Sequence, residues 1–449
     1  MNVLDHLKVL LNGEHAADVR RSANGDLSLA YTAGWVANPS GYPVSLTMPV
    51  RQGVYKDKVV APFLAGLLPD SNVHRARLGQ LFSVSGDNDF SLLSEIGREC
   101  AGAISIVRPD EPDSPELAIK PSYDVLDEAR VAQMIRDLPE RPLLADGNDM
   151  RLSLAGVNDK VGVLWSEGQV ALPTNGTPST HILKIDIKRL PDSARLENFC
   201  LRLAGAVGIK VPRSRIGVAE DLSYLLVARY DRALVQTQDG PRLRRLHQED
   251  FCQALGYAPN QKYERDGGPG WADAFRLMKR MSNPIEARQE LLSRAIFTYL
   301  VGNPDAHAKN YSILFRGGQA SLAPCYDLNN AKAFVDCFKS VRPRMAMAIG
   351  GTFDPEAVTG SNWDAFAVDC SFTPGSVRLA LREMAAKIAA ASSALGEEFR
   401  GTQAWSDRID VAIEDIRSRA LSVPQMLQRE AGAPDLAEDD GAERSFVFS

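Results

Sequence analysis

The segment from residue 302 to residue 329 restricts the fold more strongly than any other part of this chain. It begins with GNPDAHAKN and ends with CYDLN, and two apolar stretches lie between these motifs. We predict that the stretches are strands, at Tyr311–Phe315 and Leu322–Cys325, joined by the turn Arg316-Gly317-Gly318-Gln319. A hairpin returns the chain to its starting point, so Asn310 and Asp327 are expected to meet at its open end.

Asp305, Asn310 and Asp327 form a pattern that is typical of phosphoryl transfer. Asp305 and Asn310 are five residues apart, which is the spacing of the base and the metal-binding asparagine in a kinase catalytic loop. Asp327, after the hairpin, has the place of a second metal ligand, and Mg²⁺ prefers such oxygen donors. Alternatively, all three are turn and cap residues, where Asp and Asn are also favoured. The spacing, the hairpin and the second acid together favour a site.

Two regions upstream are candidates for binding a nucleotide. Lys184 is a lone cation in the apolar stretch His181–Ile185, as expected for a strand lysine that holds phosphates, and Glu197 in the next helix could pair with it. The alternatives are a lysine that protects an edge strand and a solvated glutamate. The segment from Ser153 to Lys160 could close over phosphates, although its sequence alone indicates an ordinary hairpin turn.

A third candidate region lies at the end of the strand-rich part. Backbone groups of Ala228–Tyr230 could contact adenine there, and Asp231 could bind a ribose hydroxyl; an ordinary strand-end turn is an equal alternative. His307 is expected to orient the backbone around Asp305, because a carboxylate already has the place of the base.

Composition excludes several classes of protein. The 449 residues include 51 Lys and Arg against 57 Asp and Glu, a net charge of −6, so the field of the whole chain does not favour nucleic acid. No apolar run approaches the roughly 18–20 residues of a membrane span, and the first residues lack the features of a signal peptide. The six cysteines include no C-x-x-C pair, as expected for buried residues in a reducing cytoplasm.

The order of the expected elements is a strand-rich segment followed by a mainly helical one, joined near residue 230, which is the outline of a two-lobed enzyme. We expect an N-terminal α/β subdomain at 1–110, a β-rich part at 111–230, a helical part at 231–430 and an acidic, disordered tail at 431–449.

Several individual helices are also predicted. Amphipathic spacing indicates helices at Ser122–Leu138, Ser376–Phe399 and Ser406–Leu421, with Ser406 as the N-cap of the last. Pro69-Asp70-Ser71 is expected to end one helix and cap the next.

Seven motifs along the chain resemble those of the HipA-type serine/threonine kinase toxins of bacterial toxin–antitoxin modules. They are LLPDS at 67–71, LLSEIGR at 92–98, SLAG at 153–156, THILK at 180–184, KYERDGGPG at 262–270, DAHAKN at 305–310 and YD at 326–327. The resemblance covers nearly the whole chain, and it implies an α+β, two-lobed, distantly protein-kinase-like fold. In such a fold a mixed α/β N-terminal lobe and an all-helical C-terminal lobe enclose ATP and Mg²⁺.

The resemblance also implies a role for each candidate residue. Asp305 would be the catalytic base, and Asn310 and Asp327 the metal ligands. The phosphates would be bound by Lys184 and covered by a loop of Ala155, Gly156, Val157, Asn158, Asp159 and Lys160. The rest of the nucleotide would be contacted by Ala228, Arg229, Tyr230, Asp231, His307, Lys309 and Tyr326. Ser153 would be autophosphorylated, and the loop would then leave the site, because a phosphate of roughly −2 charge cannot lie beside ATP.

The implied biology is growth arrest and persistence. The family's known target is a glutamyl-tRNA synthetase, and its partner is a helix-turn-helix antitoxin of the HipB type that binds operator DNA. Residues 350–364 contain no Lys or Arg, so we expect this chain to reach DNA only through the antitoxin. The alternatives are a pseudokinase that acts as a corepressor and a kinase for small molecules.

Overall fold

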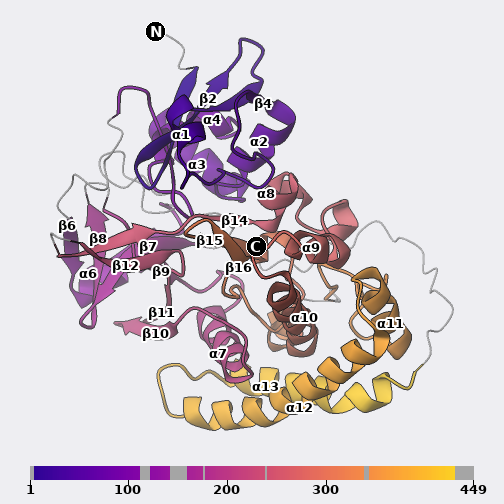
Figure 1. The fold of residues 1–449 in the computed structure, drawn as a ribbon. Helices are drawn as coiled ribbons and strands as arrows, with labels where there is room; N and C mark the ends of the chain where they lie inside the picture. Colours follow the sequence, from indigo (N-terminus) through magenta and orange to yellow (C-terminus); the bar gives the residue numbers. More distant parts are fainter. Residues whose placement is uncertain are drawn as a thin grey trace.

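The computed structural model describes residues 5–111, 122–141, 159–174, 177–237, 240–337 and 343–429 (Figure 1). Four predictions lie outside these residues: the strand at Arg151–Leu154, the phosphorylation site Ser153, the loop residues 155–158, and the tail at 431–449. Among the described residues, no helix is long and apolar enough to cross a membrane.

The N-terminal unit is an antiparallel sheet covered by short helices, drawn in indigo and violet in Figure 1. Its five strands follow the order β4-β3-β2-β1-β5. They are β1 (His6–Leu11), β2 (Glu14–Arg21), β3 (Leu27–Tyr31), β4 (Val54–Lys56) and β5 (Ile104–Val107), with helices α1 (Ala33–Ala37), α2 (Asp57–Ala65), α3 (Asn72–Phe82) and α4 (Asp89–Ile96). Buried side chains such as Leu29, Phe63 and Leu93 form a core within this unit. Ser71 caps α3 by accepting a hydrogen bond from the His74 N–H, which confirms the predicted break and cap.

A second sheet of six strands follows, in the order β10-β11-β9-β7-β8-β6. It consists of β6 (Ser122–Leu126), β7 (Lys160–Ser166), β8 (Gln169–Thr174), β9 (His181–Lys184), β10 (Ser214–Ala219) and β11 (Leu222–Ala228), with helices α6 (Glu128–Asp137) and α7 (Ser193–Ala206). The helix predicted at Ser122–Leu138 is wrong in its first part. Ser122–Leu126 pairs with β8, and the helix begins only after Asp127, whose side chain accepts the Arg130 N–H. Inter-strand pairing therefore outweighs the helical spacing there.

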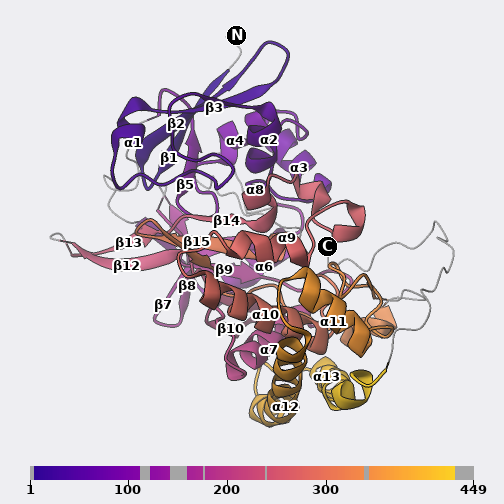
Figure 2. The same ribbon diagram turned by 45° about the vertical axis from the view of Figure 1, so that its right-hand side comes forward.

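The C-terminal part is mainly helical, but it is not purely so. Its helices are α8 (Phe251–Leu255), α9 (Trp271–Met278), α10 (Pro284–Val301), α11 (Gly360–Asp369), α12 (Pro374–Phe399) and α13 (Asp407–Met426). A three-stranded sheet of β14 (Gln248–Asp250), β15 (Ser312–Arg316) and β16 (Gln319–Leu322) lies among them. The hairpin of β12 (Arg232–Thr237) and β13 (Gly240–Arg245) extends from the body of the protein (Figure 2).

Two predictions in this part have different outcomes. The second strand was predicted at Leu322–Cys325, but it ends at Leu322, because Gly317 and Gly318 both have positive φ and form a two-residue turn that pairs Arg316 with Gln319. The predicted cap of the last helix is confirmed, since Ser406 accepts the Arg408 N–H.

Candidate active site

One cavity collects most of the predicted residues from all three parts of the chain. The predicted residues that line it are Lys160, Lys184, Ala228, Arg229, Tyr230, Asp231, Asp305, His307, Lys309, Asn310, Tyr326 and Asp327. Asp159 is not among its lining residues, and its carboxylate lies 3.0 Å from the His74 ring. The cavity lies against β9 and β11 on one side and against α8 and the β15–β16 hairpin on the other.

Amide side chains hold the loop after α10 against the segment that follows the hairpin. The Asn303 side chain donates to the Asp327 carbonyl at 3.3 Å and accepts the Asp305 N–H at 3.2 Å. Asn310 donates through Nδ2 to the Asp305 carbonyl at 2.7 Å. These bonds bring the three residues of the predicted site together, as the hairpin argument required.

Asp305 is buried and has the electrostatics of a proton acceptor. Burial raises its pKa to about 6, in opposition to the nearby Lys262 ammonium, and the Tyr263 hydroxyl donates to Oδ1 at 2.7 Å. The His307 ring lies 3.9 Å from the same carboxylate, but burial lowers its pKa to about 3, so it is neutral near pH 7. The better proton acceptor is therefore the carboxylate, as predicted.

Lys184 lies between two carboxylates. It donates to Glu197 Oε1 at 2.7 Å, which confirms the predicted contact, and to Asp327 Oδ1. β9 lies between β11 and β7, so the alternative of an edge-strand lysine is wrong. Burial raises the pKa of Glu197 to about 7, whereas Lys184 lowers that of Asp327 to about 2 against the effect of burial. Asp327 is thus the ionised member, and it has a left-handed backbone with φ of 53°.

Asn310 and Asp327 fit a magnesium ion in the chemistry of their donors. Both line the cavity, and they offer an amide oxygen and an ionised carboxylate, which are ligands that Mg²⁺ prefers. The described residues include no group of three or more His, Cys, Asp or Glu that could hold a metal by itself. The remaining ligands would therefore come from nucleotide phosphates and water.

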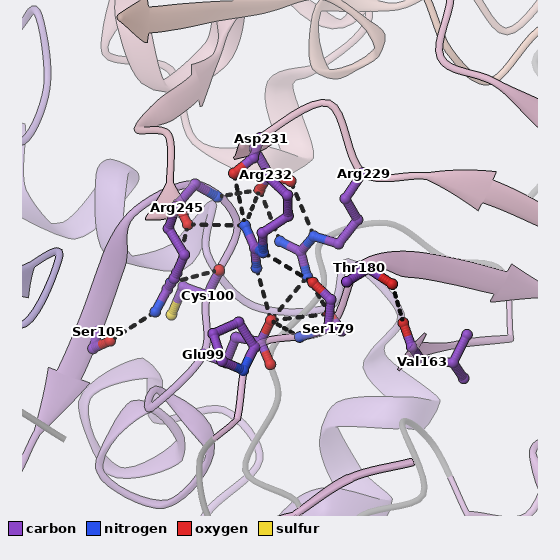
Figure 3. A network of polar contacts seen from close by, with 12 residues as sticks. Glu99, Cys100, Ser105, Val163, Ser179, Thr180, Arg229, Asp231, Arg232 and Arg245 are labelled. Carbon is purple, nitrogen blue, oxygen red and sulfur yellow. Dashed lines mark hydrogen bonds and ion pairs between the residues drawn. The ribbon is translucent and has the colours of Figure 1, made fainter. Parts of the chain in front are cut away.

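The opposite end of the cavity, after β11, contains a buried network of charges (Figure 3). The carboxylate of Asp231 accepts from Arg229 Nε at 3.0 Å and Nη2 at 2.8 Å, from Arg232 at 2.9 Å, and from the Gly102 N–H at 2.8 Å. Its oxygens are already occupied by protein donors, so the structure does not support the predicted bond to a ribose hydroxyl. The role that the contacts show for Asp231 is to join this turn to the N-terminal unit.

Two stacked tyrosines form a wall near this end. The rings of Tyr230 and Tyr326 are 5.9 Å apart with an interplanar angle of 23°. The Tyr326 hydroxyl also donates to the Lys309 carbonyl at 2.9 Å, so this wall is bonded directly to the loop that follows Asp305. Such a flat apolar surface is suited to stacking on a planar ring.

Sequence reasoning missed three charged residues of the cavity: Asp70, Asp250 and Lys262. Lys309, which was predicted, pairs with Asp250 at 2.8 Å. The available signals were the motifs LLPDS and KYERDGGPG, which contain Asp70 and Lys262. They were used as marks of resemblance and were given no chemical role.

Comparison with known proteins agrees with this geometry. Two family models match: the HipA N-terminal domain at residues 7–107 and the HipA-like C-terminal domain at 152–392. Sinorhizobium fredii Y4mE is 36% identical over 420 residues, which cover 93% of this chain and 98% of that protein. The serine/threonine-protein kinase toxin HipA of Shewanella oneidensis is 32% identical over 372 residues, which cover 80% and 81% of the two chains.

A solved structure shows the same fold. It is the Shewanella oneidensis complex of HipA, HipB and operator DNA, and one of its chains matches with a TM-score of 0.80 and 26% identity, over 94% of this chain and 100% of that one. The fold, the site and the sequence identity all lead to one conclusion. This chain belongs to the HipA family of kinases.

Proposed function

We propose that this protein is an ATP-dependent and Mg²⁺-dependent serine/threonine protein kinase. The observation that supports the proposal is the placement of Asp305, Asn310, Asp327 and Lys184 around one cavity, joined by hydrogen bonds. A base, two metal ligands and a phosphate-binding cation are the main parts that phosphoryl transfer requires from a protein.

Each residue has a defined task in this proposal. Asp305 accepts the proton of the acceptor hydroxyl, for which its raised pKa makes it a better base than an ordinary aspartate. Lys184 turns from Asp327 toward the nucleotide phosphates, and Glu197 keeps its ammonium in place. Asn310 and Asp327 would hold Mg²⁺, which supplies positive charge against the phosphates when it is bound.

The nucleotide base would lie at the end of β11. Ala228 offers backbone groups there, and the neighbouring wall of Tyr230 and Tyr326 offers an apolar face. In the same proposal, Ser153 is the autophosphorylation site, and the loop at 155–160 covers the phosphates.

The partner and the target come from the family. The Shewanella relative forms a complex with HipB and operator DNA, so we propose a helix-turn-helix antitoxin of that type as partner here. Since residues 350–364 have no Lys or Arg, contact with DNA would be made by the antitoxin. The proposed target class is the aminoacyl-tRNA synthetases, with glutamyl-tRNA synthetase as the first to test.

The test is intact-mass analysis after incubation with ATP and Mg²⁺, alone and with a panel of synthetases. Wild-type protein should gain roughly 80 Da for one phosphate on itself or on a synthetase. Asp305→Asn should give none, whereas the matched control Asp336→Asn, an exposed residue paired with Arg408, should behave as wild type. A wild-type protein that transfers phosphate to no protein would overturn the proposal, and peptide mapping that places phosphate away from Ser153 would overturn that assignment.

A further inference from the structure

Asp70 is a buried carboxylate that the N-terminal unit contributes to the catalytic cavity. It lies in the turn between α2 and α3, and its side chain is 8% exposed. Oδ2 is 3.5 Å from the Lys262 ammonium, and Oδ1 is 3.5 Å from the Lys309 ammonium. Oδ1 is buried and accepts no hydrogen bond within the described residues. One carboxylate therefore lies between two cations of the cavity without being saturated by either.

Both lysines belong to the surroundings of Asp305. Lys309 is part of the loop that runs from Asp305 to Asn310. The Lys262 carbonyl accepts the Ala308 N–H at 3.2 Å, and its ammonium lowers the pKa of Asp305 against the effect of burial. Lys262 thus has two carboxylates near its charge, Asp70 on the N-terminal unit and Asp305 on the loop.

The N-terminal unit is bonded firmly beside this cluster. Gln253 in α8 donates to the Phe63 carbonyl in α2 at 3.1 Å. Glu249 accepts from Ser45 Oγ at 2.7 Å. Gly66 leaves room for this packing, since a Cβ there would lie 2.8 Å from the Gln253 side chain. The turn that contains Asp70 therefore has a fixed position relative to α8.

A second set of bonds fixes the same unit at the other end of the cavity. Glu99 Oε1 accepts from Arg232 at 2.7 Å, from Arg229 at 3.2 Å and from Ser179 Oγ at 2.9 Å (Figure 3). With contacts at both ends, the unit can place a side chain in the cavity with the precision that phosphoryl transfer needs.

We infer that Asp70 is a positioning residue for phosphoryl transfer, which holds the Lys262 and Lys309 ammonium groups beside Asp305. The inference rests on the proposed kinase function. Asp70 attracts Lys262 and so keeps it from pairing with Asp305, which leaves the base free to accept a proton. The N-terminal unit is then a working part of the active site.

The first variant is Asp70→Asn, which keeps the shape and removes the charge. Lys262 should move toward Asp305, so kcat should fall by on the order of 10²-fold with little change in the KM for ATP. The acid limb of the kcat profile should move below its wild-type position near pH 6, because both the lost negative charge and the approaching cation lower the pKa of Asp305. A purely structural role for Asp70 would not move this limb.

Further variants make the test decisive. Lys262→Met leaves Asp70 in place, and it should lower kcat but move the acid limb upward; Asp70→Asn combined with Lys262→Met should also reverse the downward shift. The control is Asp89→Asn in the same unit, which loses an ion pair with Arg75 outside the cavity and should retain the wild-type pH profile.

The outcomes separate the two proposals. Wild-type kinetics and a wild-type pH profile in Asp70→Asn would overturn the role of Asp70 alone. If Asp70→Asn does not fold, a wild-type profile in Lys262→Met would overturn it equally. A wild-type protein without any phosphoryl transfer would overturn the proposed function and this inference together.

Discussion

The two ends of the cavity both bury carboxylates, but they satisfy them to different degrees. At the end of β11, Asp231 accepts from Arg229, Arg232 and the Gly102 N–H. At the catalytic end, Asp305 accepts one hydrogen bond from Tyr263, and Asp70 lies 3.5 Å from each of its lysines.

The pKa values follow this difference. Burial opposes ionisation at both ends, but the Arg229 and Arg232 guanidinium groups hold the pKa of Asp231 well below its usual range, whereas burial prevails at Asp305 and raises its pKa to about 6. A saturated carboxylate stabilises the fold, and one with free lone pairs can take a proton or bind a ligand. The following predictions test whether this division of labour is real.

The largest effect is expected at Asp305. Replacement by Asn removes the proton acceptor and should lower kcat by about 10² to 10⁴-fold. Thermal unfolding should shift little, because a buried charge with one hydrogen bond contributes little to folding. A variant that loses its activity only in proportion to a loss of folded protein would contradict the comparison.

Asp231→Ala should have the opposite character. It leaves two buried guanidinium groups without their main carboxylate, so the free energy of unfolding should fall by about 3–5 kcal/mol. Urea denaturation measures this value. Asp364→Ala, which breaks an ion pair with Arg378 that is about one-third exposed, should cost less than about 1 kcal/mol. Equal losses in the two variants would show that the network does not have the structural role given to it.

Lys184→Met tests the residue that faces the nucleotide phosphates. The affinity for ATP, measured by calorimetry, should fall about tenfold, which corresponds to roughly 1.4 kcal/mol. Lys210→Met is the control, because that lysine is 62% exposed and pairs with Glu286 away from the cavity. An unchanged affinity in Lys184→Met would remove Lys184 from the nucleotide site.

The smallest effect is the pH dependence of stability at Glu249, which joins α8 to the N-terminal unit. Burial raises its pKa from an ordinary value of 4.5 to about 7, so the folded state binds the proton more tightly than the unfolded state. Its contribution to stability is therefore complete below about pH 4.5 and is lost as the pH rises through about 7. Glu249→Gln should unfold at a melting temperature that depends less on pH between 5 and 7.5, and parallel curves for variant and wild type would contradict this.

Local sequence patterns predicted much of the fold. The caps at Ser71 and Ser406 and the Gly317-Gly318 turn depend on side chains and backbone within a few residues, and all are present. The prediction at Ser122–Leu138 was wrong because the pairing of Ser122–Leu126 with β8 is set by residues about 50 positions away. Periodicity contains no information about such a partner.

By itself, the sequence determined the chemistry that could occur after α10. Asp305, Asn310 and Asp327 are linked by a short loop and a hairpin, so chain geometry alone brings them near one another. Tertiary structure decided what surrounds them. Asp70 comes from a turn about 190 residues before Lys262 and about 240 before Lys309, and only the packing of the N-terminal unit on α8 places its charge between them. Burial, which raises the pKa of Asp305, is likewise a property of the assembled fold and of no single segment.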